Sequence, residues 1–508
     1  MSRGWFRQVA RGVALAAACA VLLAAAPVKR ETPLEAALHQ HIETLASDEF
    51  GGREPGTDGE TRTLRYLARQ WFDIGMESGT NDPGNAWFAP VTLVEREPLL
   101  SRASFMRGKK RIAAGDSGAF VVTSGIRSLI ENAPVLFVGH GNGTLPGRAE
   151  LAGRIALMLD SLPVGIDAGK AVDRPGRLLD AGASAVITVL DSERGIEDVV
   201  ARRRRAGYAL AGERLGGDIE AFVSPDLMGQ LLAGGVAGDL AALRTDANRP
   251  GFTPRLLGFT GTLEATSKET RIRTHNLIGK LEGRNSDAGA VLVMAHWDHF
   301  GTCAEPPAED LICNGAIDNA SGLAVITEAA RMLSRGKPLD RDVYFLATTG
   351  EELGLLGALA FAENPPLPLD RIVAAFNVDS TALVPAGRPV AIIGKGMTGL
   401  DAGIAQVMRT MKKKLVAGDA ANAYVKRQDG WVLIQHDVPA VMVSTSYSDM
   451  DRIERFMEDT YHRPSDQFGP NVQLGGAADD VQIQVELVRY FADARRYVAP
   501  REARARTP

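Results

Sequence analysis

The sequence contains few cysteines and no strong excess of either charge. Cys19, Cys303 and Cys313 are the only cysteines among 508 residues. This excludes a disulfide-dense scaffold and a cysteine-based zinc finger, so any zinc ion must be bound by histidines and carboxylates. The 57 basic residues nearly balance the 62 acidic residues, and neither half is strongly basic. The electrostatic footprint of a nucleic-acid-binding protein is therefore missing, and we expect peptides or small molecules as partners.

Long apolar runs are also missing, apart from one at the N-terminus. Arg3, Arg7 and Arg11 precede an apolar run over residues 13–26 that ends in small residues, which is typical of an export signal. We therefore predict a signal peptide over residues 1–27 and an exported protein, periplasmic or secreted. No other run is long enough for a membrane span. A lipid anchor at Cys19 is the less favoured alternative, because the apolar run continues beyond it.

The chain is longer than one hydrophobic core usually supports, so we expect at least two globular units. Short strand-like runs extend from about residue 130 to about residue 255, which indicates an inserted β-rich domain over residues 130–255. We predict that residues 28–129 and 256–500 form the main domain and that residues 501–508 form a tail. The sequence does not indicate an oligomeric state.

The second half of the chain alternates apolar strand-like runs with helical segments. Predicted strands cover residues 291–296, 342–349 and 372–379, and predicted helices cover residues 321–333 and 353–362. Near-continuous apolar strands are typical of parallel sheets that are buried on both faces. We therefore predict an α/β fold with a doubly wound, mostly parallel sheet. Such sheets bind their ligands beyond the carboxyl ends of the strands.

Candidate metal ligands lie at these strand ends. His296 closes the first strand, and Asp298 shares its face, so Asp298 can reach the ring nitrogen of His296 that does not bind metal. A polar strand end with a hydrogen-bonded histidine is the alternative. Asp318 stands at the start of the next helix, where it could instead be a capping residue.

Adjacent glutamates follow the second predicted strand. Glu351 and Glu352 point in different directions, so one can bind a metal while the other reaches a water molecule. Two solvated glutamates at a helix start are the alternative. Asp379 ends the third strand, and His462 lies in a late loop after Tyr461. Two histidines and three carboxylates would leave two zinc ions with a net positive charge.

These segments resemble the co-catalytic dizinc aminopeptidase and glutamate carboxypeptidase family of zinc exopeptidases. The resemblance extends over residues 34–495 and includes Gly52-Arg53-Glu54-Pro55-Gly56 and Val438-Pro439-Ala440. It implies that the insert at residues 130–255 is a protease-associated domain. It also implies two zinc ions per chain, held by five residues: His296, Asp318, Glu352, Asp379 and His462.

The resemblance further implies a role for each of these residues. Asp318 would bridge the two ions, His296 and Asp379 would complete one, and His462 and Glu352 the other.

Three more residues receive roles, and one receives none. The resemblance implies that Glu351 is the general base and that Asp298 orients His296. Tyr461 is a candidate oxyanion donor, although a packing tyrosine explains its position equally well. The segment Gln428-Asp429-Gly430-Trp431 departs from the Ser-Asp-His of many relatives, so Asp429 is left without a role.

We predict a dizinc metallopeptidase that removes N-terminal residues from peptides, and several alternatives remain open. A dizinc carboxypeptidase of the same fold needs arginines for the terminal carboxylate of its substrate, and Arg427, Arg452 and Arg455 could serve. A single-zinc aminoacyl cyclase and a non-catalytic receptor-like binding protein are further alternatives. Whether Cys303 and Cys313 form a disulfide is also left open.

Overall fold

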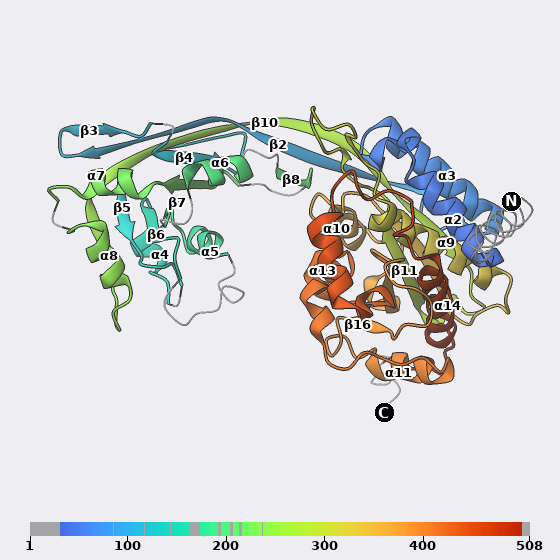
Figure 1. Cartoon of the computed structure of the whole chain (residues 1–508). Coiled ribbons are helices and arrows are strands. Elements are labelled where there is room, and N and C mark those ends of the chain that lie inside the picture. Colours follow the sequence, from blue (N-terminus) through green and yellow to red (C-terminus); the bar gives the residue numbers. More distant parts are fainter. Residues whose placement is uncertain are drawn as a thin grey trace, which may run out of the picture. The chain divides into compact units, whose positions relative to one another are not determined.

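The computed structural model describes residues 31–499, except residues 85, 116, 143, 163–172, 192–194, 204–206, 213–215 and 236 (Figure 1). The predicted signal peptide, Cys19 and the predicted tail over residues 501–508 lie outside the described residues. The chain divides into two compact units. The first comprises Met1–Trp87, Leu277–Thr348 and Pro365–Pro508, and the second comprises Phe88–Asn276 and Thr349–Asn364.

The first unit contains a mostly parallel sheet with the strand order β16-β17-β15-β11-β14-β10. Strands β14, β11, β15 and β17 run parallel, whereas β16 and β10 pair antiparallel on either side of them. Its strands are β11 (Ala290–His296), β14 (Asp342–Thr348), β15 (Ile372–Asn377), β16 (Ala391–Ile393), β17 (Ala440–Ser444), the end of β10 (Arg255–Leu281) and the short β1 (Glu77–Ser78). The carboxyl ends of the four parallel strands therefore meet at one edge of the sheet.

Helices cover this sheet. They are α2 (Pro33–Leu45), α3 (Asp58–Ile74), α9 (Gly322–Ser334), α11 (Asp401–Thr410), α12 (Gly430–Gln435), α13 (Met450–Asp459) and α14 (Leu474–Phe491). In β11, Val291 and Val293 pack into the same core as α9 and α14, and Leu292 and Met294 on the other face are buried as well. Burial on both faces explains why this strand is apolar at every position.

Local sequence signals set the ends of the N-terminal helices. Thr32 Oγ1 accepts a hydrogen bond from the amide of Glu35 at 3.2 Å, and Glu35 Oε2 accepts one from the amide of Thr32 at 2.7 Å. This capping box, with Pro33 in the first turn, starts α2 and is worth about 1 kcal/mol. Gly75 ends α3 with a left-handed φ of 89°, which glycine adopts without steric cost.

The strands of the second unit follow the order β10-β5-β6-β7-β9-β4. Strands β5, β6, β7 and β9 are parallel, and β10 and β4 pair antiparallel with β5 and β9. Its strands are β2 (Phe88–Arg107), β3 (Lys110–Ala113), β4 (Ala119–Thr123), β5 (Arg127–Phe137), β6 (Ile155–Leu159), β7 (Ala185–Val189), β8 (Gly207–Leu210), β9 (Ile219–Val223) and most of β10. Its helices are α4 (Arg148–Leu151), α5 (Arg174–Asp180), α6 (Ile196–Arg203), α7 (Pro225–Leu232), α8 (Leu240–Ala247) and α10 (Leu356–Glu363).

The predicted α/β class with a mostly parallel sheet is confirmed, and the predicted strands and helices of the second half match β11, α9, β14, α10 and β15 within a few residues. The second unit contains the whole predicted insert, residues 130–255, and continues beyond it on both sides because β2 pairs with β10. That this unit is a protease-associated domain stays a prediction. Within the described residues, no helix has the length and apolarity needed to cross a membrane.

One buried carboxyl group makes the stability of the first unit depend on pH. Asp480 on α14 is fully buried and accepts hydrogen bonds from Ser444 Oγ at 2.7 Å and from the amide of Thr445 at 2.8 Å. Burial raises the pKa of Asp480 from 3.8 to about 7. The folded-state pKa thus lies above the unfolded one. The protonated Asp480 carboxyl therefore makes its full contribution to the free energy of unfolding below pH 3.8. This contribution is lost as the pH rises through about 7.

We predict that Asp480→Asn changes this pH dependence. Asparagine is neutral throughout, so the free energy of unfolding of the variant should rise relative to that of the parent between about pH 5 and about pH 8. Urea unfolding of both proteins at the two pH values, with a chelator present, measures the difference. An equal difference at both pH values would contradict the prediction.

Candidate metal centre

His296 is the last residue of β11, a strand with parallel neighbours on both sides. Its register partner on β14 is Thr348, the last residue of that strand, and Met294 pairs with Asn377, which ends β15. Asp379 follows β15 by two residues. The three strand ends thus carry their polar side chains to one edge of the sheet, as expected for a ligand site in a parallel sheet.

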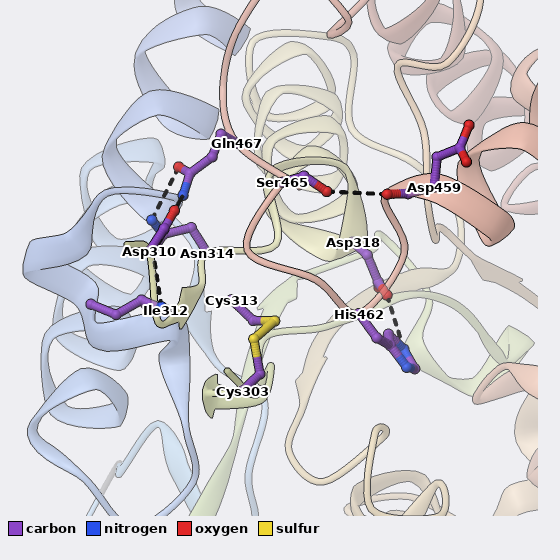
Figure 2. The surroundings of a disulfide bond; sticks show 10 residues. All are labelled: Cys303, Asp310, Ile312, Cys313, Asn314, Asp318, Asp459, His462, Ser465 and Gln467. Atoms are coloured by element: carbon purple, nitrogen blue, oxygen red, sulfur yellow. Dashed lines mark hydrogen bonds and ion pairs between the residues drawn. A yellow bond between two sulfur atoms is a disulfide. The ribbon is translucent and has the colours of Figure 1, made fainter. Parts of the chain in front are cut away.

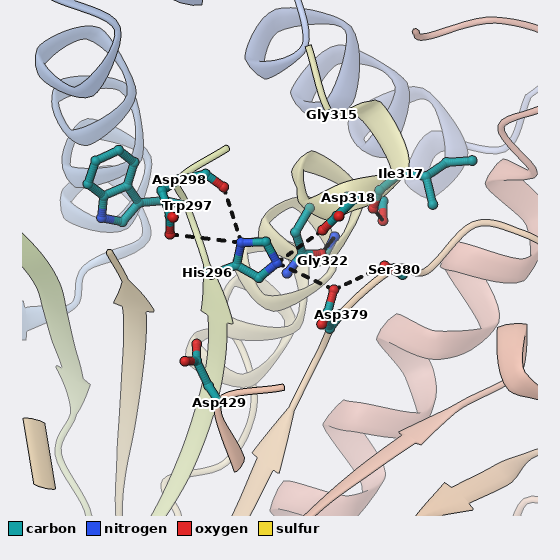
Figure 3. Close-up of polar contacts among 12 residues, drawn as sticks. His296, Trp297, Asp298, Gly315, Ile317, Asp318, Gly322, Asp379, Ser380 and Asp429 are labelled. Carbon is teal, nitrogen blue, oxygen red and sulfur yellow. Dashed lines mark hydrogen bonds and ion pairs between the residues drawn. The ribbon is translucent and has the colours of Figure 1, made fainter. Parts of the chain in front are cut away.

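Two carboxylates converge on one ring nitrogen of His296 (Figure 3). Nε2 of His296 lies 3.1 Å from Oδ1 of Asp318 and 3.4 Å from Oδ1 of Asp379. The ligand atoms of these three residues all lie within 4.8 Å of one another. The three side chains are buried, so water does not screen the two negative charges effectively.

The other ring nitrogen of His296 is held by the backbone. Nδ1 lies 3.1 Å from the carbonyl oxygen of Asp298, whereas the Asp298 carboxylate is 3.9 Å away. The expected contact from Asp298 therefore comes chiefly from its main chain. With a proton on Nδ1, the lone pair of Nε2 faces two carboxylates, and this arrangement requires a cation between them or a second proton on the ring.

Asp318 lies between two histidines from distant parts of the chain. Its Oδ1 faces His296, and its Oδ2 lies 3.5 Å from Nε2 of His462 (Figure 2). Burial alone would raise the pKa of Asp318, but hydrogen bonds from His296 and His462 hold it well below 3.8. The carboxylate stays ionised, and each of its oxygens is directed to a different imidazole.

The donor set fits zinc. Imidazole nitrogens and carboxylate oxygens are common zinc ligands. The carbonyl behind His296 fixes the ring in the way that is typical of metal-binding histidines.

The two glutamates belong to the second unit. Glu351 and Glu352 follow the end of β14 at Thr348 by three and four residues. Glu351 is buried and Glu352 is half-buried. The carbonyl of Glu351 accepts hydrogen bonds from the amides of Gly354 and Leu355, which fixes this turn of the backbone. Their roles as base and ligand stay predictions.

Comparison with known proteins identifies the segment that carries these residues. Residues 276–482 match the sequence model of the family described as Peptidase family M28. We call these matched residues the M28 segment. It contains all the candidate ligands of the centre, from His296 to His462.

Relatives of known name match shorter stretches. The alkaline phosphatase isozyme conversion protein of Escherichia coli K12 is 30% identical over 125 residues, which cover 23% of this chain and 35% of that protein. Aminopeptidase YwaD of Bacillus subtilis 168 is 33% identical over 119 residues, 23% of each chain. The chain therefore spans about a third or less of the length of these relatives.

A solved structure shares the fold over most of the chain. The aminopeptidase from Aneurinibacillus sp. strain AM-1 has a TM-score of 0.54 at 19% identity, over 90% of this chain and 93% of that chain. This likeness confirms the fold class.

Tyr461 is packed between aromatic and cationic groups of the M28 segment. Its ring stacks on His462 with centroids 3.5 Å apart, and the ring of Phe456 lies 5.7 Å away. The guanidinium of Arg427 lies 5.4 Å from the Tyr461 ring centre. These contacts fix the ring beside His462, and its role as oxyanion donor stays a prediction.

The other two candidate arginines lie on α13. Arg452 donates to the carbonyl of Leu383 at 3.0 Å. Arg452 and Arg455 line a cavity of about 360 Å³ together with Ile317. Arg427 therefore has the more direct contact with the candidate centre, through Tyr461.

The open question about Cys303 and Cys313 is answered, because the two form a disulfide (Figure 2). It closes the antiparallel pair β12 (Gly301–Thr302) and β13 (Ile312–Cys313), between the His296 and Asp318 segments. Asn314, the next residue, donates to Asp48 Oδ1 at 2.6 Å. The loop beside the centre is therefore fixed to the N-terminal segment.

Two site residues of the M28 segment were missed by sequence reasoning. Asp429 (Figure 3) is buried and accepts a hydrogen bond from Thr348 Oγ1 at 2.5 Å, and burial raises its pKa to about 7. The sequence analysis left Asp429 without a role because the residues around it depart from the family pattern. Burial, and then the charges of Asp379 and Asp318, raise the pKa of Tyr447 well above 10. Tyr447 therefore remains a donor, and no sequence signal marked it.

We predict that zinc stabilises the folded protein, because a cation removes the repulsion between Asp318 and Asp379. At a zinc concentration about 1,000 times its Kd, the gain should be about 4 kcal/mol. Thermal unfolding with zinc and with chelator measures it.

A matched pair of variants tests the location of the zinc site. Asp379→Asn should reduce the zinc response. Asp342→Asn, at the opposite end of β14, should keep it; Asp342 is also buried and accepts from the amide of Gly283 at 2.7 Å. Equal responses of the two variants would contradict the assigned site.

Proposed function

We propose that the protein is an exported dizinc aminopeptidase. The observation that carries the proposal is the position of Asp318, whose two oxygens face His296 and His462 at 3.1 and 3.5 Å. A carboxylate between two imidazoles is suited to bridging two metal ions. A single-zinc cyclase would need only one such set of ligands.

Each ion would have its own ligands in addition to Asp318. His296 and Asp379 would hold one ion, and His462 and Glu352 the other. Chain connectivity supports Glu352, because four residues after Thr348 span at most about 14 Å. Thr348 is the register partner of His296.

The reaction would be hydrolysis of the first peptide bond of the substrate. When bound, the zinc ions would supply Lewis acidity to the scissile carbonyl and make a water molecule acidic enough to react near neutral pH. The Glu351 carboxylate would accept the proton of the attacking water and deliver it to the leaving amine nitrogen. The Tyr461 hydroxyl would donate a hydrogen bond to the developing oxyanion.

The preference for an aminopeptidase rests on one similarity. The chain is 33% identical over 119 residues to a protein named an aminopeptidase, YwaD. The bridging geometry is common to both exopeptidase types and does not separate them. The carboxypeptidase remains the second candidate, because Arg427 places a cation against Tyr461, next to His462.

Export is part of the proposal. Residues 1–27 read as a signal peptide, and disulfides such as Cys303–Cys313 persist mainly in oxidising compartments. The disulfide is therefore consistent with a periplasmic or secreted protein. Comparing the chain mass of the secreted or periplasmic protein with that of the full sequence would test removal of the signal.

We predict that cleavage requires a free N-terminal amine on the substrate. N-acetylation of a di- or tripeptide should abolish cleavage, and C-terminal amidation should leave it. Release of the first amino acid, measured by chromatography, is the assay. The reverse pattern would favour the carboxypeptidase.

We further predict different defects for the two adjacent glutamates. Glu351→Gln cannot accept a proton, so zinc content should persist while turnover falls by about two to four orders of magnitude. Glu352→Gln weakens a charged ligand, so it should lose zinc affinity and regain some activity in excess zinc. Bound zinc and turnover at several zinc concentrations distinguish them. If excess zinc restores Glu351→Gln instead, the two roles are exchanged.

A further inference from the structure

The short peptide before Asp318 lies between a buried cation and a buried anion. Arg53 is fully buried in η1 (Asp48–Arg53), and Asp466 is 1% exposed, four residues after His462. Neither is among the candidate zinc ligands. Both direct their charged groups to the backbone of residues 314–318.

Arg53 donates all five of its guanidinium N–H groups to backbone carbonyls. The acceptors, at 2.6 to 3.3 Å, are the carbonyl oxygens of Leu45, Trp297, Asn314, Gly315 and Asp318. Arginine has five N–H donors in a fixed planar arrangement, so this set uses its full capacity. One side chain thus connects the residue after His296 with the main chain of Asp318 itself.

Asp466 binds the donor groups of the same peptide. Its carboxylate accepts from the amide of Ile317 at 3.0 Å and from the amide of Asp318 at 3.0 Å. Its own carbonyl accepts from the amide of Ala316 at 3.1 Å. The loop that carries His462 is therefore fastened to the peptide that carries Asp318.

We propose that Arg53 and Asp466 are positioning residues that form a clamp on the Asp318 peptide and so direct its carboxylate to both metal ions. The proposal rests on the dizinc function proposed above. The carbonyls of the peptide are fixed by a cation and its amides by an anion, so the peptide can neither turn nor shift without breaking charge-assisted hydrogen bonds. Outer contacts of this kind typically change metal affinity by about 10- to 100-fold.

The packing around Gly315 supports the clamp. Gly315 has a φ of +57°, and a Cβ there would lie 2.8 Å from an Arg53 guanidinium nitrogen and 2.1 Å from the carbonyl oxygen of Asp318. Only glycine lets the chain approach Arg53 this closely while adopting that conformation. Glycine at position 315 thus permits the close contacts that the clamp requires.

A matched pair at the opposite edge of the sheet provides controls. Arg341 is also fully buried and donates to the carbonyls of Ala288, Phe491 and Tyr497. Asp342, next to it, is buried and accepts from a backbone amide. Asp342 begins β14 and Arg341 directly precedes it, whereas the candidate centre lies at the end of that strand.

The test compares Arg53→Lys and Asp466→Asn with Arg341→Lys and Asp342→Asn. Lysine keeps the charge but cannot reach five carbonyls, and asparagine cannot accept from two amides with both of its terminal atoms. Zinc affinity is measured by competition with a chelator at a temperature where each variant is folded. The absorption spectrum of the cobalt(II)-substituted protein reports the ligand geometry.

The clamp predicts that Arg53→Lys and Asp466→Asn weaken zinc binding by about 10- to 100-fold and change the cobalt spectrum. The controls should lose thermal stability but keep the affinity and spectrum of the parent. The proposal would be overturned if the zinc affinities of the clamp variants were within twofold of that of the parent. It would also be overturned if all four variants lost zinc affinity in proportion to their loss of Tm. Failure of both clamp variants to fold would also overturn it, because the pair would then support the fold rather than place a ligand.

The number of zinc ions bound by the parent distinguishes a failure of this proposal from a failure of the proposed function. If the parent itself binds fewer than two zinc ions, the dizinc function fails. If the parent binds two and the clamp variants match it, only the clamp fails.

Discussion

Mutual repulsion between buried carboxylates is the constraint on which the centre depends. Asp318 and Asp379 approach the same nitrogen of His296 at 3.1 and 3.4 Å, and all three residues are buried. Such a group of like charges is stable only with positive charge among them. Zinc would supply that charge and also suits the nitrogen and oxygen donors present. The proposed reaction uses the same feature, because the cations that would stabilise the site would also supply the Lewis acidity for hydrolysis.

The scaffold holds the repelling groups in place. Parallel pairing brings the ends of β11, β14 and β15 together, and the apolar strands are rigid because both faces are buried. The loops beyond those ends lie outside this parallel pairing. Arg53, Asp466 and the disulfide at Cys313 attach these loops to one another. The N-terminal segment therefore contributes to the centre although it provides no predicted ligand.

The sequence predicted the residues at the strand ends, but it did not predict the contacts that side chains make with the backbone of other segments. The apolar runs before His296, Glu351 and Asp379 predicted three strands correctly. A strand that is buried on both faces is apolar at nearly every position, and this pattern is visible in the sequence. The partners of Arg53 are carbonyl oxygens, which every residue has, so no side-chain pattern could reveal them. The extent of the second unit was equally hidden, because the long strand β2 shows no regular alternation of buried and exposed residues.

The account's central claim is that the Asp318 carboxylate bridges two zinc ions. Anomalous diffraction at the zinc edge from crystals of the zinc-loaded protein tests it most directly. The account predicts two peaks about 3.5 to 4 Å apart, one beside His296 and Asp379 and one beside His462, with one Asp318 oxygen bound to each. A single peak at full zinc loading, or two peaks of which only one contacts Asp318, would contradict it.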